Sequence, residues 1–190
     1  MPRTIDVEFE TGVARAMLAE LAAYLESDVA YWQTAPNALG DRMPKLTLGG
    51  LLEALVHAEA AGSPETQSMR AELESIRSKR LERYVWHAEQ EVGSRLDAWA
   101  WYLDDYARNP ADVAAYYPNE VRARFKAELL LEELALQRRG EAQRRRAASL
   151  DERVRASFRA GRFVWDDRLQ RFCPPDRVWW LYGRLKAPGG

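Results

Sequence analysis

The feature that most restricts the fold is a long stretch without proline, which runs from residue 65 to residue 109. Ser63 and Pro64, directly before it, match a helix N-cap and a first helical position. Its later apolar positions alternate spacings of three and four, the pattern of helices packed side by side: Leu81, Val85, Ala88, Val92, Leu96, Trp99, Leu103 and Tyr106. The stretch predicts one helix of about 45 residues, roughly 65–70 Å long, with a kink expected at Gly93.

Apolar residues also recur at helical spacing in the segments 13–32, 47–62, 119–137 and 138–160. At the N-terminus, Ile5, Val7 and Phe9 instead alternate with charged residues, which predicts a short strand that pairs with the C-terminal segment or forms an extended arm. We therefore expect an all-α fold, a bundle of five or six helices with one long central helix and a short extended N-terminal or C-terminal element.

A length of 190 residues suits one domain with a substantial core. We expect a single α-helical domain over 1–190, with the helical bundle over 11–160 and an aromatic C-terminal segment, 161–190, packing on it. Because large rings carry much apolar area, at least two of Trp165, Trp179 and Trp180 should be largely buried.

Few residues in the chain suit catalysis or metal binding. The single cysteine, Cys173, rules out an internal disulfide and a cysteine-built zinc site. The stretch LTLGGLLEALVHAEA resembles the second helix of DinB-like metal-binding bundles, whose three-histidine sites need one histidine more than this chain has. Moreover, His57 is predicted to face solvent, opposite the leucine stripe of its helix. We expect no metal, no cofactor and no catalytic residue, since no nucleophile arrangement or phosphate-binding loop is recognisable.

The sequence also allows a prediction of where in the cell the protein is located. No run approaches the roughly 18 apolar residues that a membrane span needs. Charges occupy the N-terminal positions where a secretory signal needs its apolar region. These features predict a cytoplasmic protein that does not bind membranes.

Basic residues are concentrated in the second half of the chain. Residues 1–110 carry 11 basic and 18 acidic side chains, a net charge of −7, whereas residues 111–190 carry 17 and 11, a net charge of +6. On a helical wheel of residues 138–160, five arginines occupy one sector, opposite the apolar one: Arg138, Arg139, Arg145, Arg146 and Arg153. Such a face can bind the phosphates of a nucleic acid, an acidic protein surface or the protein's own acidic half.

The segment DAWAWYLDDY, residues 97–106, is rich in both aromatic and acidic residues. At 100° per residue, Trp101 points roughly 160° away from Trp99 on the predicted helix. Both sides of this helix should therefore be covered, either by the bundle core or by a partner. Asp97 and Asp105 frame Trp101 and do not converge as a catalytic pair would.

Charged residues interrupt the apolar stripes of two predicted helices. Asp28 falls within the stripe of segment 13–32, and Arg80 and His87 fall within the stripe of the long helix. Buried charges need partners, so we expect Asp28 to contact Arg80 or His87, with Tyr24 or Tyr84 nearby. The same cluster could begin a ligand site.

The sequence favours a non-catalytic helical interaction protein, with a protein partner or a second copy, in a protein or nucleoprotein assembly that uses the arginine-rich face. The alternative is a small helical-bundle enzyme or ligand binder with a site between the helix of residues 13–32 and the long helix.

Overall fold

The computed structural model describes residues 5–35, 39–40 and 43–187. The chain divides into two compact units, which we call the N-terminal unit (residues 5–91) and the C-terminal unit (residues 92–187). The expectation that residues 1–190 form a single domain stays a prediction. As expected, the fold is all-α, with seven α-helices and one two-stranded sheet in the described ranges.

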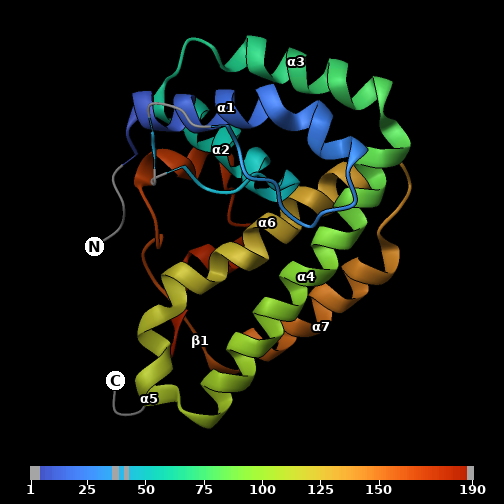
Figure 1. Cartoon of the computed structure of the whole chain (residues 1–190). Helices are drawn as coiled ribbons and strands as arrows, with labels where there is room; N and C mark the ends of the chain where they lie inside the picture. Colours follow the sequence, from blue (N-terminus) through green and yellow to red (C-terminus); the bar gives the residue numbers. More distant parts are fainter. Residues whose placement is uncertain (1–4, 36–38, 41–42, 188–190) are drawn as a thin grey trace. The chain divides into compact units, whose positions relative to one another are not determined.

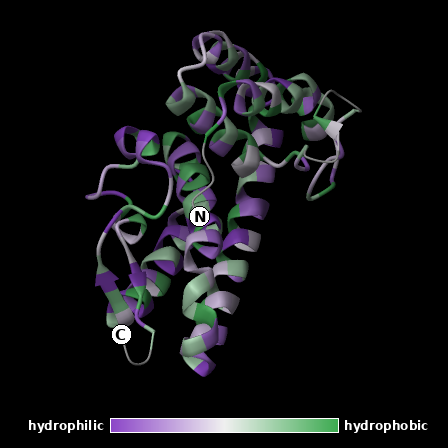
Figure 2. Ribbon diagram, turned by 90° about the vertical axis from the view of Figure 1, so that its left-hand side faces the viewer, coloured by the Kyte–Doolittle hydropathy of each residue, from purple (hydrophilic) through white to green (hydrophobic). Residues whose placement is uncertain are grey.

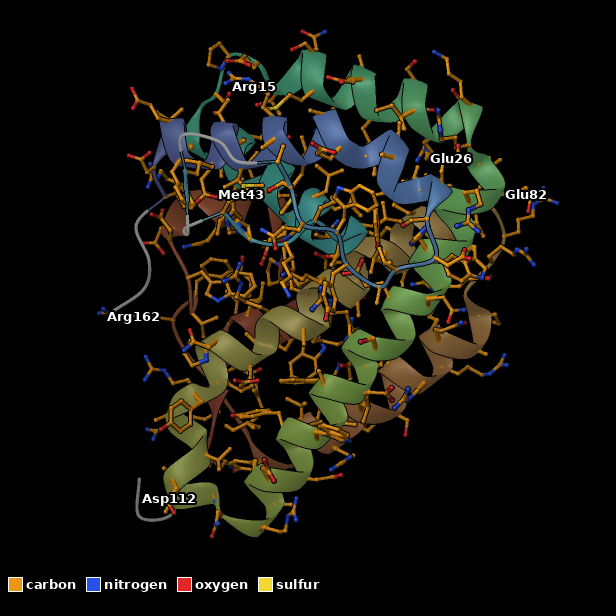
Figure 3. All side chains as sticks on the ribbon, viewed as in Figure 1. Arg15, Glu26, Met43, Glu82, Asp112 and Arg162 are labelled. Atoms are coloured by element: carbon orange, nitrogen blue, oxygen red, sulfur yellow. The ribbon has the colours of Figure 1, made fainter. Side chains whose placement is uncertain are left out.

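Three complete helices form most of the N-terminal unit: α1 (Val7–Glu26), α2 (Leu48–Ala61) and α3 (Thr66–Lys79). Helix α1 contacts both α2 and α3, and α3 runs along α1 in Figure 1. Helix α4 (Leu81–Arg108) begins in this unit and ends in the C-terminal unit. In the turn before α3, Glu65 accepts hydrogen bonds from Arg15 of α1, which is labelled in Figure 3.

The predicted single long helix is in fact two helices. Helix α3 ends at Lys79 and α4 begins at Leu81, because Arg80 leaves the helical region with φ −134° and ψ 33°. Gly93, where a kink is expected, lies inside α4, and the helical stretch is broken at Arg80 instead. A straight helix of about 45 residues would run more than twice as far as the 20 residues of α1. Ending α3 at Lys79 lets it bury Met69 and Leu73 without continuing beyond α1.

The predicted N-terminal strand is also wrong, because this segment begins α1. Asp6 is the N-cap of the helix, and its Oδ1 accepts a hydrogen bond from the backbone N–H of Phe9 at 2.7 Å. Two acidic residues, Glu8 and Glu10, lie in the first turn, where the helix dipole favours negative charge. This cap outweighs the short alternation of apolar and charged residues.

The C-terminal unit contains the later part of α4, α5 (Pro110–Val113), α6 (Tyr117–Leu136) and α7 (Glu141–Ser157). Short 3₁₀ turns cover Ala114–Tyr116, Asp167–Phe172 and Trp179–Leu181. The extended element pairs β1 (Phe158–Ala160) with β2 (Gly183–Leu185) in an antiparallel ladder. A short extended element therefore exists, but it lies in the C-terminal part of the chain.

The aromatic C-terminal segment makes specific contacts with α6. Trp180 is 2% exposed, and its backbone carbonyl accepts a 2.7 Å hydrogen bond from the Tyr117 hydroxyl. Trp165 donates its indole N–H to the carbonyl of Pro118 at 2.7 Å. Trp165 and Trp179 are half-buried, so one of the three tryptophans is fully buried and two are partly covered.

Candidate interaction surface

Helix α7 carries three of the five arginines predicted to share one helical face. Arg145, Arg146 and Arg153 lie on this helix and are exposed. Arg138 and Arg139 are also exposed, but they lie in the turn between α6 and α7. The prediction of one helical face is wrong for these two, because α6 ends before them.

Gly140 explains this boundary. It is the N-cap of α7 with φ 81°, in the left-handed region that favours glycine, and Arg138 also has a positive φ of 56°. Two left-handed residues within three positions prevent a continuous helix through this turn.

The α7 arginines are paired with carboxylates. Arg146 donates to Asp97 at 2.6 Å, and Arg153 donates to Asp104 at 2.6 Å. Both aspartates lie on α4, seven residues apart, as do the two arginines on α7. Arg145 bonds to Glu141 of its own helix at 3.1 Å. The two interhelical pairs therefore join α4 to α7 and partly neutralise the arginine charge.

Trp101 lies on the same side of α4, between Asp97 and Asp104 in the helical spacing. Trp101 is 75% exposed, the largest value among the exposed large hydrophobic residues in the described ranges. Trp99 is fully buried and stacks on Tyr102, with ring centroids 5.4 Å apart. The core covers only one side of this helix. We call the set Asp97, Trp101, Asp104, Arg146 and Arg153 the Trp101 face.

A buried charged cluster lies inside the C-terminal unit, and sequence reasoning missed it. Arg124 of α6 is 4% exposed and donates to Glu128 at 2.8 Å and to both oxygens of Asp151 at 2.9 Å. Its guanidinium also lies 4.0 Å from the ring centroid of Trp180. The available signal was the i, i+4 spacing of Arg124 and Glu128. The cluster joins α6, α7 and the C-terminal segment.

The predicted buried contact of Asp28 with Arg80 or His87 is wrong. Asp28 is 83% exposed at the side chain and pairs with Arg83 at 2.8 Å. Arg80 instead pairs with Glu26 at 2.8 Å, near the end of α1 labelled in Figure 3. The reason is that α1 ends at Glu26, so Asp28 lies past its end and no longer follows the helical stripe.

Side chains of α4 instead satisfy the backbone at the end of α1. Arg83 donates to the carbonyls of Leu25 at 2.7 Å and of Ser27. A ring nitrogen of His87 lies 3.0 Å from the same Ser27 carbonyl, and its ring lies 4.4 Å from that of Tyr24. Desolvation by burial lowers the pKa of His87, and the nearby Arg83 charge adds to this effect. Here, where the alternative function predicted a ligand site, Arg83 and His87 bind backbone carbonyls.

His57 is more buried than predicted. Its side chain is 13% exposed, and its Nδ1 lies 3.4 Å from a carboxylate oxygen of Glu10. The prediction that it faces solvent is wrong because α2 is buried on nearly all sides, including Glu53 at 4% exposure. Within the described residues, Nε2 of His57 and the hydroxyl of Thr11 are buried without a hydrogen-bond partner.

The chemistry of the remaining polar groups is limited. In the described ranges, no group of three or more His, Cys, Asp and Glu side chains is placed to hold a metal ion. Cys173 is fully buried, and this burial is the main cause that raises the pKa of its thiol to about 12. A protonated, covered thiol is a poor nucleophile.

No helix within the described residues is both long enough and apolar enough to cross a bilayer. No protein-family model, curated protein or solved structure matches the sequence or the fold.

Proposed function

We propose that this chain is a non-catalytic interaction protein that associates with a second copy of itself through the Trp101 face. The observation that carries the proposal is the 75% exposure of Trp101 between two interhelical ion pairs. Tryptophan and arginine are the residues most enriched where protein interfaces gain their binding energy. We also propose a cytoplasmic location, since Cys173, the only cysteine, is a free thiol.

The charges around Trp101 favour a protein partner at this face over a nucleic acid. Asp97, Asp104 and Asp105 are all exposed on the same part of α4. A phosphate chain that approached Arg146 and Arg153 would meet these carboxylates, which repel it and already bind the guanidinium groups. A protein surface can supply both charge signs.

The arrangement of charges favours a second copy in particular. On this face, α4 carries the acidic groups and α7 carries the basic groups. A two-fold axis through the surface places α4 of one protomer against α7 of the other. The acidic groups on α4 of each protomer then face the basic groups on α7 of the other, and the two Trp101 rings lie near the axis. Self-complementarity of this kind is what a symmetric dimer interface requires.

Sedimentation equilibrium of the purified protein over a roughly 100-fold concentration range tests the proposal. We expect a reversible monomer–dimer equilibrium that Trp101→Ala weakens by about tenfold or more, since a central tryptophan contributes about 2 kcal/mol or more. Tyr116→Ala is the matched control, because it removes a 58% exposed ring from the same unit. A wild-type chain that stays monomeric throughout the range contradicts the proposal.

Charge exchange tests the orientation of the two copies. Asp97→Arg or Arg146→Asp alone places like charges opposite each other, so each should weaken the dimer. Exchanging all four charges in one chain (Asp97→Arg/Asp104→Arg/Arg146→Asp/Arg153→Asp) restores opposite signs within and between protomers, so the dimer should recover. If the quadruple variant stays as weak as the single variants, the two-fold arrangement is wrong.

A further inference from the structure

Two arginines lie directly opposite each other on the small sheet. In the ladder of β1 with β2, Arg159 pairs with Arg184, and both side chains are exposed. Side chains at such positions have Cβ atoms about 4.5–5.5 Å apart, and like charges placed there destabilise the sheet. Figure 2 shows the colour of hydrophilic residues on both strands.

These two arginines form no ion pair with a carboxylate of the described residues. In the part of the chain that the structure describes, Arg159, Arg162, Arg184 and Lys186 form no ion pair, although all four are exposed. Other exposed arginines of the same unit do have partners, as Arg153 with Asp104 and Arg168 with Asp166 show. We call these four residues the cationic strand pair. Its charge remains available to an external anion.

The backbone beneath these side chains is held in place. Alternation along β2 buries Gly183 and Leu185 and exposes Arg184, and Lys186, directly after the strand, is exposed as well. Gly183 has φ 154°, and a Cβ at this position would collide with the carbonyl oxygen of Arg159. The strands therefore approach closely where only glycine fits, which fixes the position of the arginine pair.

Aromatic side chains support the same strands. The Phe158 ring packs edge-on against Trp179, with centroids 5.0 Å apart, and the Tyr106 hydroxyl donates to the carbonyl of Lys186 at 2.7 Å. Binding an anion would therefore require little reorganisation of the backbone, which lowers the entropic cost of binding.

We propose that the cationic strand pair binds the phosphodiester backbone of a nucleic acid. Guanidinium groups form paired hydrogen bonds with phosphate oxygens, so two adjacent arginines suit one phosphate well. Arg162 and Lys186 extend the positive charge beyond the reach of a single phosphate, which favours a chain of phosphates. This site is separate from the Trp101 face and does not depend on dimerisation.

The composition of the surface argues against a membrane as the source of the phosphate. Interfacial binding needs exposed apolar side chains beside the cations. None of the exposed large hydrophobic residues in the described part of the chain lies within residues 158–187. A nucleic acid requires no such anchor.

Fluorescence anisotropy with a labelled single-stranded oligonucleotide and the matching duplex tests the proposal. With about four phosphate contacts, affinity for the single strand should fall roughly 50-fold between about 50 and 200 mM salt. Arg159→Gln/Arg184→Gln should reduce affinity at least tenfold and flatten this salt dependence. Arg145→Gln/Arg168→Gln removes the same net charge from arginines that have carboxylate partners, and it should retain most of the binding. Equal loss in the two double variants would overturn the proposal.

The single variant Arg184→Glu distinguishes a loss of nucleic-acid binding from a loss of folding stability. It replaces a like-charge pair with an opposite-charge pair, so the melting temperature should rise by roughly 1–3 °C while nucleic-acid binding is lost. A melting temperature that falls would mean that Arg184 stabilises the free protein, which contradicts an arginine pair held ready for an anion.

Competing anions identify the chemistry that is recognised. Polyglutamate should displace the oligonucleotide poorly, and phosphatidylserine vesicles should bind the protein less than the oligonucleotide does. Displacement by polyglutamate at equal charge concentration would show recognition of charge alone, and preferential binding to vesicles would show a membrane site. Either result overturns the proposal.

Discussion

Arg124 of α6 holds both carboxylate oxygens of Asp151 of α7 at 2.9 Å, within the interior of the C-terminal unit. Burial opposes the charge on Arg124, but the hydrogen bonds and charges of Asp151 and Glu128 outweigh it and raise the pKa of the guanidinium. Arg124 therefore keeps its charge in the interior, and the stability of the cluster depends on all its members being present.

Removing one charged residue of this cluster should lower the free energy of unfolding far more than removing all three. We expect Arg124→Met to lower the free energy of unfolding by about 3–5 kcal/mol, because Asp151 and Glu128 stay behind as uncompensated buried charges. The triple variant Arg124→Met/Glu128→Leu/Asp151→Leu should recover most of the loss. Urea denaturation measures both. As a control, Arg108→Met breaks an exposed pair with Asp105 and should cost less than about 1 kcal/mol.

Arg80, directly before α4, and Arg83, in its first turn, should differ in how much they contribute to stability. Arg83 satisfies carbonyls at the end of α1, so Arg83→Met should cost about 1–3 kcal/mol. Arg80 forms an exposed ion pair with Glu26, so Arg80→Met should cost at most about 1 kcal/mol. Thermal denaturation of the two variants provides the measurement. Equal losses would show that the carbonyl contacts of Arg83 contribute little.

Stability should also depend on the protonation of His87. Its pKa is lowered in the folded state, so the unfolded chain binds a proton more readily, and the free energy of unfolding rises with pH in that window. The contribution is complete above about pH 6.5, the ordinary pKa of histidine, and is lost as the pH falls toward the folded pKa.

Denaturation of wild type and His87→Gln from about pH 7 to pH 5 measures this dependence. The difference in unfolding free energy between the two proteins should narrow as the pH falls. Carboxylates titrate in both proteins, so their contribution cancels in the difference. A constant difference across the range would show that His87 has the same pKa in both states.

The sequence predicted those parts of the fold that depend on local periodicity and caps. Thr47 and Gly62 bound α2 as expected, and the stripe through Leu96, Trp99 and Leu103 is buried. The predicted cap at Ser63 is wrong, because α3 begins at Thr66 with Glu65 as its N-cap. The break at Arg80 could not be predicted in this way, because no proline or glycine causes it. It depends on how far α3 extends along α1, which is a tertiary property.

The partners of the charged side chains could not be predicted from local sequence either. The helical wheel correctly predicted that Arg146 and Arg153 are exposed. Their ion-pair partners, Asp97 and Asp104, could be identified only from the packing of α4 against α7. Arg159 lies in the basic second half of the chain, yet its position opposite Arg184 depends on pairing two strands more than twenty residues apart. Periodicity indicates which side chains share a face, whereas partners between elements require the fold.

The thiol of Cys173 can report local opening of the C-terminal segment. It is fully buried, so a thiol reagent can reach it only when the segment separates from the unit. Tyr117 holds this segment through its hydrogen bond to the Trp180 carbonyl. Tyr117→Phe removes that bond at a cost of about 0.5–1.5 kcal/mol, so thiol labelling in native buffer should accelerate roughly two- to tenfold. Tyr116→Phe alters a ring that is 58% exposed and should leave the labelling rate unchanged. Equal rates in wild type and both variants would show that labelling proceeds through an opening that leaves the contact between Tyr117 and Trp180 intact.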